Sequence, residues 1–324
     1  VKNGGSILVF FVNPKEHRVL NMSINKLLIK FNIAFSFLFL NDNDNSQEAQ
    51  PVQSIFSYVK DLNLLPLIAD YKTLLQKDET LDSVSLDSVV SNLRYYVLVC
   101  EGEKFYDKIT DLSEASLEYL KRTNYIKDGK ICTETPQGIV TVLLVQLSHK
   151  LPVNMITKSP TIELFPGITG DVKLGDFEID FDLNSELWIS TGLWLPPGVV
   201  GVIEADEPMP SVTVHIGSHA DVLYTKLQPW TRWPNVTTIA TMMRKKIEVA
   251  SSFGGITYII LNNPQKEIHS KIRFHNFCKY PVADSADPSR WQLTKGIQVP
   301  WGEIVSKNVI FTLPTEHIRK IESI

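Results

Sequence analysis

Two histidines four residues apart, His215 and His219, have the spacing that places a pair of zinc ligands on one face of a helix. The residues before them, Val-Thr-Val at 212–214, alternate between branched apolar and polar types and therefore predict a strand. Side chains four residues apart on an extended strand lie about 13 Å apart, too far to share one ion. We therefore expect no metal at this pair, and we interpret His219 as a hydrogen-bonded residue in the turn after the strand.

Other candidate groups for chemistry are isolated. Glu267, His269 and His275 fall along a predicted alternating strand and are expected on the surface. Cys100 follows the apolar run YYVLV, so burial is expected rather than a nucleophilic role. The sequence contains no H-E-x-x-H, G-x-G-x-x-G, P-loop or G-x-S-x-G motif. We predict no catalytic residue, no metal ligand and no cofactor site within this chain.

The tryptophans occur in pairs, and exposed tryptophans of a lectin-like sandwich stack on sugars. The candidate binding surface consists of Trp188, Trp194, Trp230 and Trp233. The alternative interpretation of the same rings is packing in the core and loops. A carbohydrate-binding module therefore stays open as one hypothesis.

Composition restricts the class of protein. The chain has 324 residues, a net charge of −4 and 44% hydrophobic residues, which is typical of an ordinary globular protein with more than one domain. The absence of a basic excess argues against nucleic-acid binding. Three well-separated cysteines argue against a disulfide framework, and a reducing compartment is expected. No signal-peptide pattern and no apolar run of about 20 residues occurs, so neither secretion nor a transmembrane segment is predicted.

Short alternating or apolar runs, closed by Gly, Pro or Asn, dominate the second half of the chain. They predict strands at 177–181, 187–190, 199–204, 212–216, 237–240, 246–249 and 256–261, with two more at 268–274 and 308–312. Seven evenly spaced short strands favour a β-sandwich or a jelly-roll-like module.

The first half predicts different structure. An apolar run at 6–12 reads as a buried strand, the polar stretch NDNDNSQEAQ at 41–50 as a loop or linker, and the region 51–150 as mostly helical. Thr135 followed by Pro136 predicts the start of one helix. At the other end of the chain, Thr315 is expected to cap a helix that is still running at the last residue, so we expect a fragment of a longer protein.

Three ordered motifs resemble the enhancin-like metallopeptidase module of peptidase family M60. They are STGLWLPPG at 190–198, IGSHAD at 216–221 and FGGITYI at 253–259. The motif residues given a structural role are Gly192, His219, Asp221, Gly254 and Gly255. Further stretches, KNGGSILV at 2–9, PWGE at 300–303 and NVIFTLPTE at 308–316, make the chain similar to the TRP-melastatin channel-associated factors, the TCAF family.

The resemblance implies an α+β multidomain architecture. Residues 1–40 would be the end of an amidotransferase-like α/β domain, 41–155 a mostly helical connector, 160–265 a β-sandwich, and 266–324 the start of a gluzincin-like domain. The family's zinc ligands would lie beyond residue 324, so zinc is implied only if a downstream domain is intact.

The resemblance also implies a function. It predicts a non-catalytic regulator that binds a cold-sensing TRP-melastatin cation channel, promotes its surface delivery and modulates its gating. The implied location is cytoplasmic and peripheral at the plasma membrane. The alternative is the N-terminal part of an enhancin-like zinc metallopeptidase that acts on glycoproteins.

Overall fold

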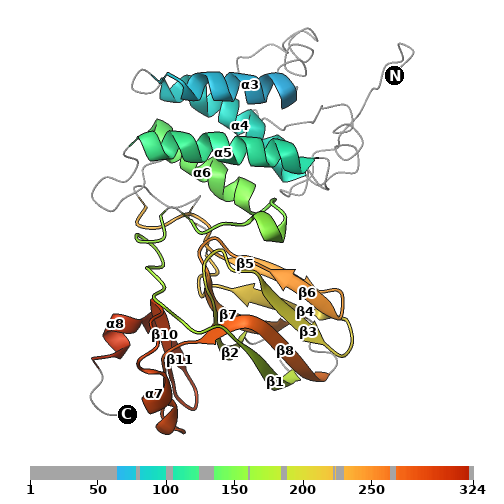
Figure 1. The fold of residues 1–324 in the computed structure, drawn as a ribbon, viewed down its shortest axis with the longest axis vertical. Coiled ribbons are helices and arrows are strands. Elements are labelled where there is room, and N and C mark those ends of the chain that lie inside the picture. The colour runs from blue at the N-terminus through green and yellow to red at the C-terminus, as the bar shows by residue number, and fades with distance from the viewer. Residues whose placement is uncertain are drawn as a thin grey trace, which may run out of the picture. The chain divides into compact units, whose positions relative to one another are not determined.

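The computed structural model describes residues 64–77, 81–99, 105–123, 135–159, 161–183, 188–221, 223, 230–262 and 268–320. The predictions for 1–40, the polar stretch at 41–50 and Cys100 lie outside these residues. The chain divides into two compact units, one formed by 1–125 with 133–150 and the other by 126–132 with 151–324. Helices predominate in the first and strands in the second (Figure 1), which confirms a mixed helix and strand chain.

The helical unit contains four described helices. They are α3 (Leu64–Leu75), α4 (Ser83–Val99), α5 (Tyr106–Arg122) and α6 (Pro136–Ser148). An apolar stripe along α4 is buried at Leu86, Val90 and Leu93, in the region predicted to be mostly helical. The predicted start of α6 is confirmed, because the Thr135 hydroxyl accepts a hydrogen bond from the Gly138 N–H at 3.1 Å.

Within the sheet unit, a 3-10 turn at Val153–Met155 precedes the strands. Its strands are β1 (Gly175–Leu183), β2 (Trp188–Leu195), β3 (Gly201–Ala205), β4 (Met209–Ile216), β5 (Thr238–Met242), β6 (Lys246–Val249), β7 (Gly255–Leu261) and β8 (Ile268–Lys279). All seven strands predicted for the sandwich are present within a few residues of their expected positions. Alternation and turn residues are therefore sufficient to locate them.

Strand β8 connects the two parts of the sheet. The strand order is β5-β4-β7-β2-β8-β3-β6, and β1 also pairs with β8 (Figure 1). Along β8, residues 272–275 pair with β3 and residues 278–279 pair with β2. Asn276, between these two pairings, has a φ of 67°, and its side chain donates to the Val200 carbonyl at 3.1 Å. This left-handed residue is where β8 passes from one set of neighbours to the other.

The apolar core is shared by all eight strands. Its fully buried members include Ile203 of β3, Val212 of β4, Ile259 of β7 and Phe274 of β8. The opposite face of β1 and β8 carries charge, because acidic residues of β1 stand directly opposite basic residues and histidines of β8. In the two outer pairs, Asp176 with His275 and Asp182 with His269, the histidine Nδ1 lies 3.1 Å from the carboxylate Oδ1. His269 and His275 therefore contact carboxylates across the strands on this face.

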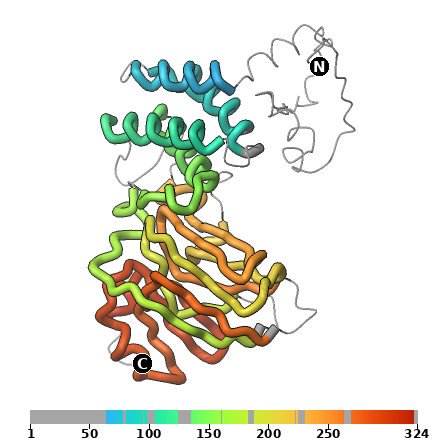
Figure 2. Tube along the Cα trace, turned by 45° about the vertical axis from the view of Figure 1, so that its right-hand side comes forward, coloured from blue at the N-terminus to red at the C-terminus, as the bar shows by residue number. Residues whose placement is uncertain are grey.

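The C-terminal residues of the sheet unit form a small second sheet. It consists of β9 (Val282–Asp284), β10 (Trp301–Val305) and β11 (Ile310–Pro314), accompanied by α7 (Ser289–Thr294) and α8 (Thr315–Ile318). The red segment in Figure 2 shows these elements beside the larger sheet, and β10 contacts β7.

Strand β8 supplies Ile272, Phe274 and Phe277 to the shared core, so the larger sheet continues past residue 265. The domain boundary expected between 265 and 266 stays a prediction. One prediction needs correction here. Thr315 does not cap a helix with its side chain: Pro314 occupies the cap position and the Thr315 hydroxyl is buried without a partner among the described residues. The Thr315 N–H donates instead to the Pro300 carbonyl at 2.9 Å, which ties α8 to the start of β10.

Candidate functional site

The three motifs of the sheet unit lie on adjacent strands. The segment 190–198 covers most of β2 and the turn after it, 253–259 covers the start of β7, and 216–221 follows the end of β4. Strand β7 pairs with β2 on one side and with β4 on the other. The motifs, more than 60 residues apart in sequence at their extremes, therefore meet at one end of one sheet.

Close backbone contact explains the motif glycines. A Cβ atom on Gly254 would lie 2.5 Å from the Leu195 carbonyl oxygen, and one on Gly255 would lie 2.6 Å from the Gly217 Cα. Both φ angles are positive, at 64° and 150°, where side chains are strained. Glycine at these positions lets the ends of β2, β4 and β7 touch.

Gly192 has a different role within β2. Its φ is 73°, and the pairing of β2 with β7 shifts register between Ser190 and Trp194. This irregularity is the β-bulge that a positive-φ glycine permits. The Thr191 hydroxyl stabilises it by donating to the Thr257 carbonyl at 2.7 Å.

His219 packs between two aromatic rings. Its ring centroid lies 4.9 Å from that of Phe165 and 5.4 Å from that of Trp301, edge-on in both cases. Burial, and then the nearby Arg232 charge, lower the pKa of His219 below its ordinary value, so the ring is neutral at pH 7. The expected hydrogen bond in the turn is reduced to a marginal 3.5 Å contact with Ser218, and aromatic packing is the main interaction.

Asp221 holds the chain beyond His219. Its carboxylate forms an ion pair with Arg232 at 2.8 Å, and Arg232 also donates to the Trp233 carbonyl at 2.9 Å. The small cavity against His219 and Trp301 has a volume of about 10 Å³, room for about one water molecule. The strand ends and side chains pack closely at this end of the sheet, and the cavity is too small for a substrate.

A buried carboxylate of the small second sheet contacts both β2 and β7. Glu303 of β10 is 1% exposed and accepts hydrogen bonds from Tyr280 at 2.6 Å, Ser190 at 2.7 Å and Tyr258 at 3.0 Å. Thr312 of β11 adds a weaker contact at 3.5 Å. Among the described residues, no Lys, Arg or His forms an ion pair with Glu303, so hydroxyl groups alone compensate its desolvation there.

The two tyrosines of this cluster are firmly protonated. Burial, and then the neighbouring Glu303 carboxylate, raise the pKa of Tyr258 and of Tyr280 well above the ordinary value. Both therefore act as hydrogen-bond donors and not as bases at neutral pH. We call Glu303, Ser190, Tyr258, Tyr280 and Thr312 the hydroxyl cluster.

The hydroxyl cluster joins motifs that the sequence presents separately. Ser190 opens STGLWLPPG, Tyr258 lies in FGGITYI and Glu303 closes PWGE. Sequence reasoning missed these residues as a group. The available signal was their shared membership of motifs, since neither spacing nor periodicity predicts contacts over 113 residues, as between Ser190 and Glu303.

The structure divides the four candidate tryptophans. Trp194, Trp230 and Trp233 are buried and present no face to a sugar in solution. Trp188 is 37% exposed, and its ring centroid lies 4.3 Å from His215 and 5.2 Å from Tyr258. Trp233 donates its indole N–H to the Thr161 hydroxyl, which fixes the ring inside the unit.

The described residues contain no group of three or more His, Cys, Asp or Glu side chains arranged to hold a metal ion. His215, the first histidine of the zinc-like spacing, is buried with Nδ1 2.9 Å from the Gly217 carbonyl oxygen. The thiol of Cys278 is also buried, and burial raises its pKa to about 12, so this cysteine is not a thiolate at neutral pH.

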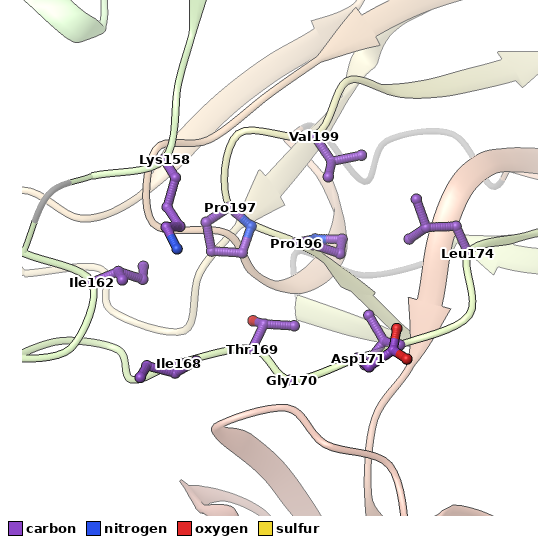
Figure 3. A pocket seen from close by; sticks show the side chains of 11 residues that line it. Lys158, Ile162, Ile168, Thr169, Gly170, Asp171, Leu174, Pro196, Pro197 and Val199 are labelled. Atoms are coloured by element: carbon purple, nitrogen blue, oxygen red, sulfur yellow. The ribbon is translucent and has the colours of Figure 1, made fainter.

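An open groove lies beside the Pro-Pro-Gly turn that ends the first motif. Figure 3 shows its two walls, one formed by the turn and the other by the segment 168–174. Its volume is about 250 Å³, enough for one or two side chains of a partner.

Comparison with known proteins supports the motif-based resemblance at two levels. The family model for the N-terminal domain of M60-like peptidases matches residues 173–275, which include strands β1 to β7 and most of β8. The match crosses the boundary expected at 265, in agreement with the pairing of β8.

The curated relatives are more specific. TRPM8 channel-associated factor 3 of Mus musculus is 26% identical over 194 residues, which cover 57% of this chain and 21% of the relative. TRPM8 channel-associated factor 2 of Mus musculus is 32% identical over 145 residues, 43% of this chain and 16% of the relative. The chain thus spans about a fifth or less of these relatives. The predicted resemblance to channel-associated factors with an M60-like module is confirmed.

A solved structure is also similar. The IMPa metallopeptidase from Pseudomonas aeruginosa has 14% identity and a TM-score of 0.48, with 85% of this chain and 30% of that chain covered.

Proposed function

We propose that this chain belongs to a non-catalytic regulator that associates with the TRPM8 channel, promotes its delivery to the cell surface and modulates its gating. The observation that carries the proposal is the similarity to several curated proteins whose names state association with that channel. The chain contributes the sheet unit, a rigid body whose strand ends are fixed by glycine contacts and by the hydroxyl cluster.

We place the protein on the cytoplasmic side of the plasma membrane as a peripheral component. Among the described residues, none of the helices combines the length and the apolar character that crossing a bilayer requires. Attachment would then depend on the channel. In cells with and without the channel, the fraction of the chain that sediments with membranes is expected to rise when the channel is present.

Co-precipitation tests the association directly. The tagged chain and the channel are expressed together, and an unrelated cation channel of similar abundance serves as the control. We expect recovery of the chain with TRPM8 and not with the control channel. Absence of recovery, with the chain shown to be folded by its tryptophan fluorescence, would remove channel association from this part of the protein.

Regulation needs its own measurement. Surface biotinylation is expected to show more channel at the cell surface in the presence of the full-length protein, and whole-cell recording is expected to show an altered cold-evoked current per surface channel. Association without either effect would leave a binding role and contradict regulation.

The second candidate function is the N-terminal part of an M60-like metallopeptidase. The match of residues 173–275 to the peptidase N-terminal domain favours it. The transcript downstream of residue 324, together with the zinc content of the full-length protein, separates the candidates. An H-E-x-x-H helix with about one zinc per chain would support the peptidase, and a degraded motif without zinc would exclude it.

A further inference from the structure

The groove beside the Pro-Pro-Gly turn has walls that are set before any ligand binds. A Cβ atom on Gly198 would lie 2.6 Å from the Lys158 backbone nitrogen, so the turn packs directly against the chain at Lys158. On the opposite wall, the Gly170 N–H donates to the Gln298 carbonyl at 2.7 Å. A ligand that binds a preformed groove loses little binding free energy to the ordering of the groove residues.

The interior of the groove is mixed in character, with apolar side chains beside polar groups. The rings of Pro196 and Pro197 face the side of the groove that carries Ile168 and Leu174 (Figure 3). Ile168 is 60% exposed and Leu174 is 37% exposed. These surfaces gain free energy when an apolar side chain covers them.

Opposite charges stand at the two ends. Figure 3 shows Lys158 at one end of the groove and Asp171 at the other. Both side chains are exposed, and neither forms a hydrogen bond or ion pair with another described residue. Because the two side chains lie at opposite ends of the groove, each is available to a ligand.

We propose that this groove binds an extended peptide segment in which an acidic and a basic residue flank apolar residues. The acidic residue pairs with Lys158, the basic residue pairs with Asp171, and an apolar side chain fills the space between the prolines and Ile168. The chemistry of the groove selects this occupant, because a lipid surface would not require the carboxylate of Asp171 and a nucleic acid would be repelled by it. The inference goes beyond the proposed function, since it does not depend on which protein carries the segment.

The test uses the full chain and four blocked tetrapeptides, with Glu-Leu-Val-Lys as the main probe and Glu-Leu-Val-Glu, Lys-Leu-Val-Lys and Gln-Leu-Val-Gln as comparisons. Binding is followed by saturation-transfer NMR titration. We expect the chain to bind the Glu/Lys peptide most tightly, with about a three- to fivefold loss for each mismatched charge. An equal affinity for the Gln/Gln peptide would overturn the role of the charges.

Charge-reversal variants change the preference in a defined way. K158E is expected to prefer the Lys/Lys peptide, D171K the Glu/Glu peptide, and the double variant K158E/D171K is expected to bind the Glu/Lys peptide again in the opposite direction. Lys158 and Asp171 are exposed, so these substitutions leave the fold intact. The matched controls are K307E and E163K, which reverse exposed charges outside the groove lining.

Three results would refute the proposal. They are no saturation transfer with any tetrapeptide, an order of affinities that the reversals leave unchanged, and controls that change the order as much as the groove variants. Equal binding of blocked leucine alone would reduce the groove to a small apolar site and overturn the peptide assignment. Channel association can fail while this test succeeds, so the two proposals are separable.

Discussion

Removal of one hydroxyl group from the hydroxyl cluster has a calculable cost. In Tyr280→Phe the ring keeps its packing but the 2.6 Å hydrogen bond to Glu303 is lost, and Ser190 becomes the remaining partner within 3.0 Å of that carboxylate oxygen. Tyr280 is 0% exposed, so water cannot replace the donor. A hydrogen bond to a charged group contributes about 1.5–3 kcal/mol, and we expect a loss of about 2 kcal/mol in the free energy of unfolding.

The charge of Glu303 makes this prediction specific. Glu303→Gln is nearly the same size and removes the charge, so Tyr280→Phe in that background removes an ordinary hydrogen bond contributing about 1 kcal/mol. The double-mutant cycle is therefore expected to give a coupling energy of about 1–2 kcal/mol. Thr312→Val is the control, because it removes only two long contacts, at 3.5 Å to Glu303 and at 3.3 Å to the Tyr258 hydroxyl, with an expected loss below about 0.5 kcal/mol.

The assay is urea unfolding followed by tryptophan fluorescence. The six tryptophans lie between residues 188 and 301, all within the sheet unit, so the signal reports this unit and not the helices. A coupling energy near zero, with Tyr280→Phe equally costly in both backgrounds, would refute a charged acceptor at the centre of the cluster. A cost of Tyr280→Phe no greater than that of Thr312→Val would refute the contact itself.

Three further changes follow from the same unit, each measured by the urea midpoint of the tryptophan signal. Gly255→Ala is expected to cost more than about 2 kcal/mol, because its Cβ would lie 2.6 Å from the Gly217 Cα, and an unchanged midpoint would contradict that contact. Thr257→Val is expected to stabilise by up to about 1 kcal/mol, since the Thr257 hydroxyl is buried without a partner among the described residues; a loss of stability would reveal one. Because the pKa values of Tyr258 and Tyr280 are raised in the folded state, stability should be complete below about pH 10 and fall as pH rises further, less steeply in Tyr280→Phe; equal slopes in both proteins would contradict the assignment.

The strands were predictable because their signal is local. Alternation in the segment that became β1 places Phe177, Ile179 and Phe181 on one face, and Pro196 followed by Pro197 and Gly198 marks the turn after β2. The start of α6 was equally local, since a capping Thr followed by Pro fixes it within two residues.

Long-range partners were not predictable in the same way. Glu303 lies in a short strand where a single acidic residue is typical of an exposed position, and its burial depends on hydroxyl groups 45 and 113 residues away. The strand at 268–274 was predicted, but its partners were not, because the pattern of residues changes after residue 262 while the strand pairing continues. Burial of Trp230 and Trp233 likewise depends on neighbours that no local pattern specifies.

The central position of β8 has a consequence for synthesis on the ribosome. Strand β1 pairs with β8 alone among the described strands, yet about 100 residues separate their starting points in the chain. At a typical elongation rate of 5–20 residues per second, the apolar face of β1 emerges about 5–20 s before its partner. The apolar face of β1 therefore stays without its strand partner during that interval, and the pairing can form only after β8 has left the exit tunnel.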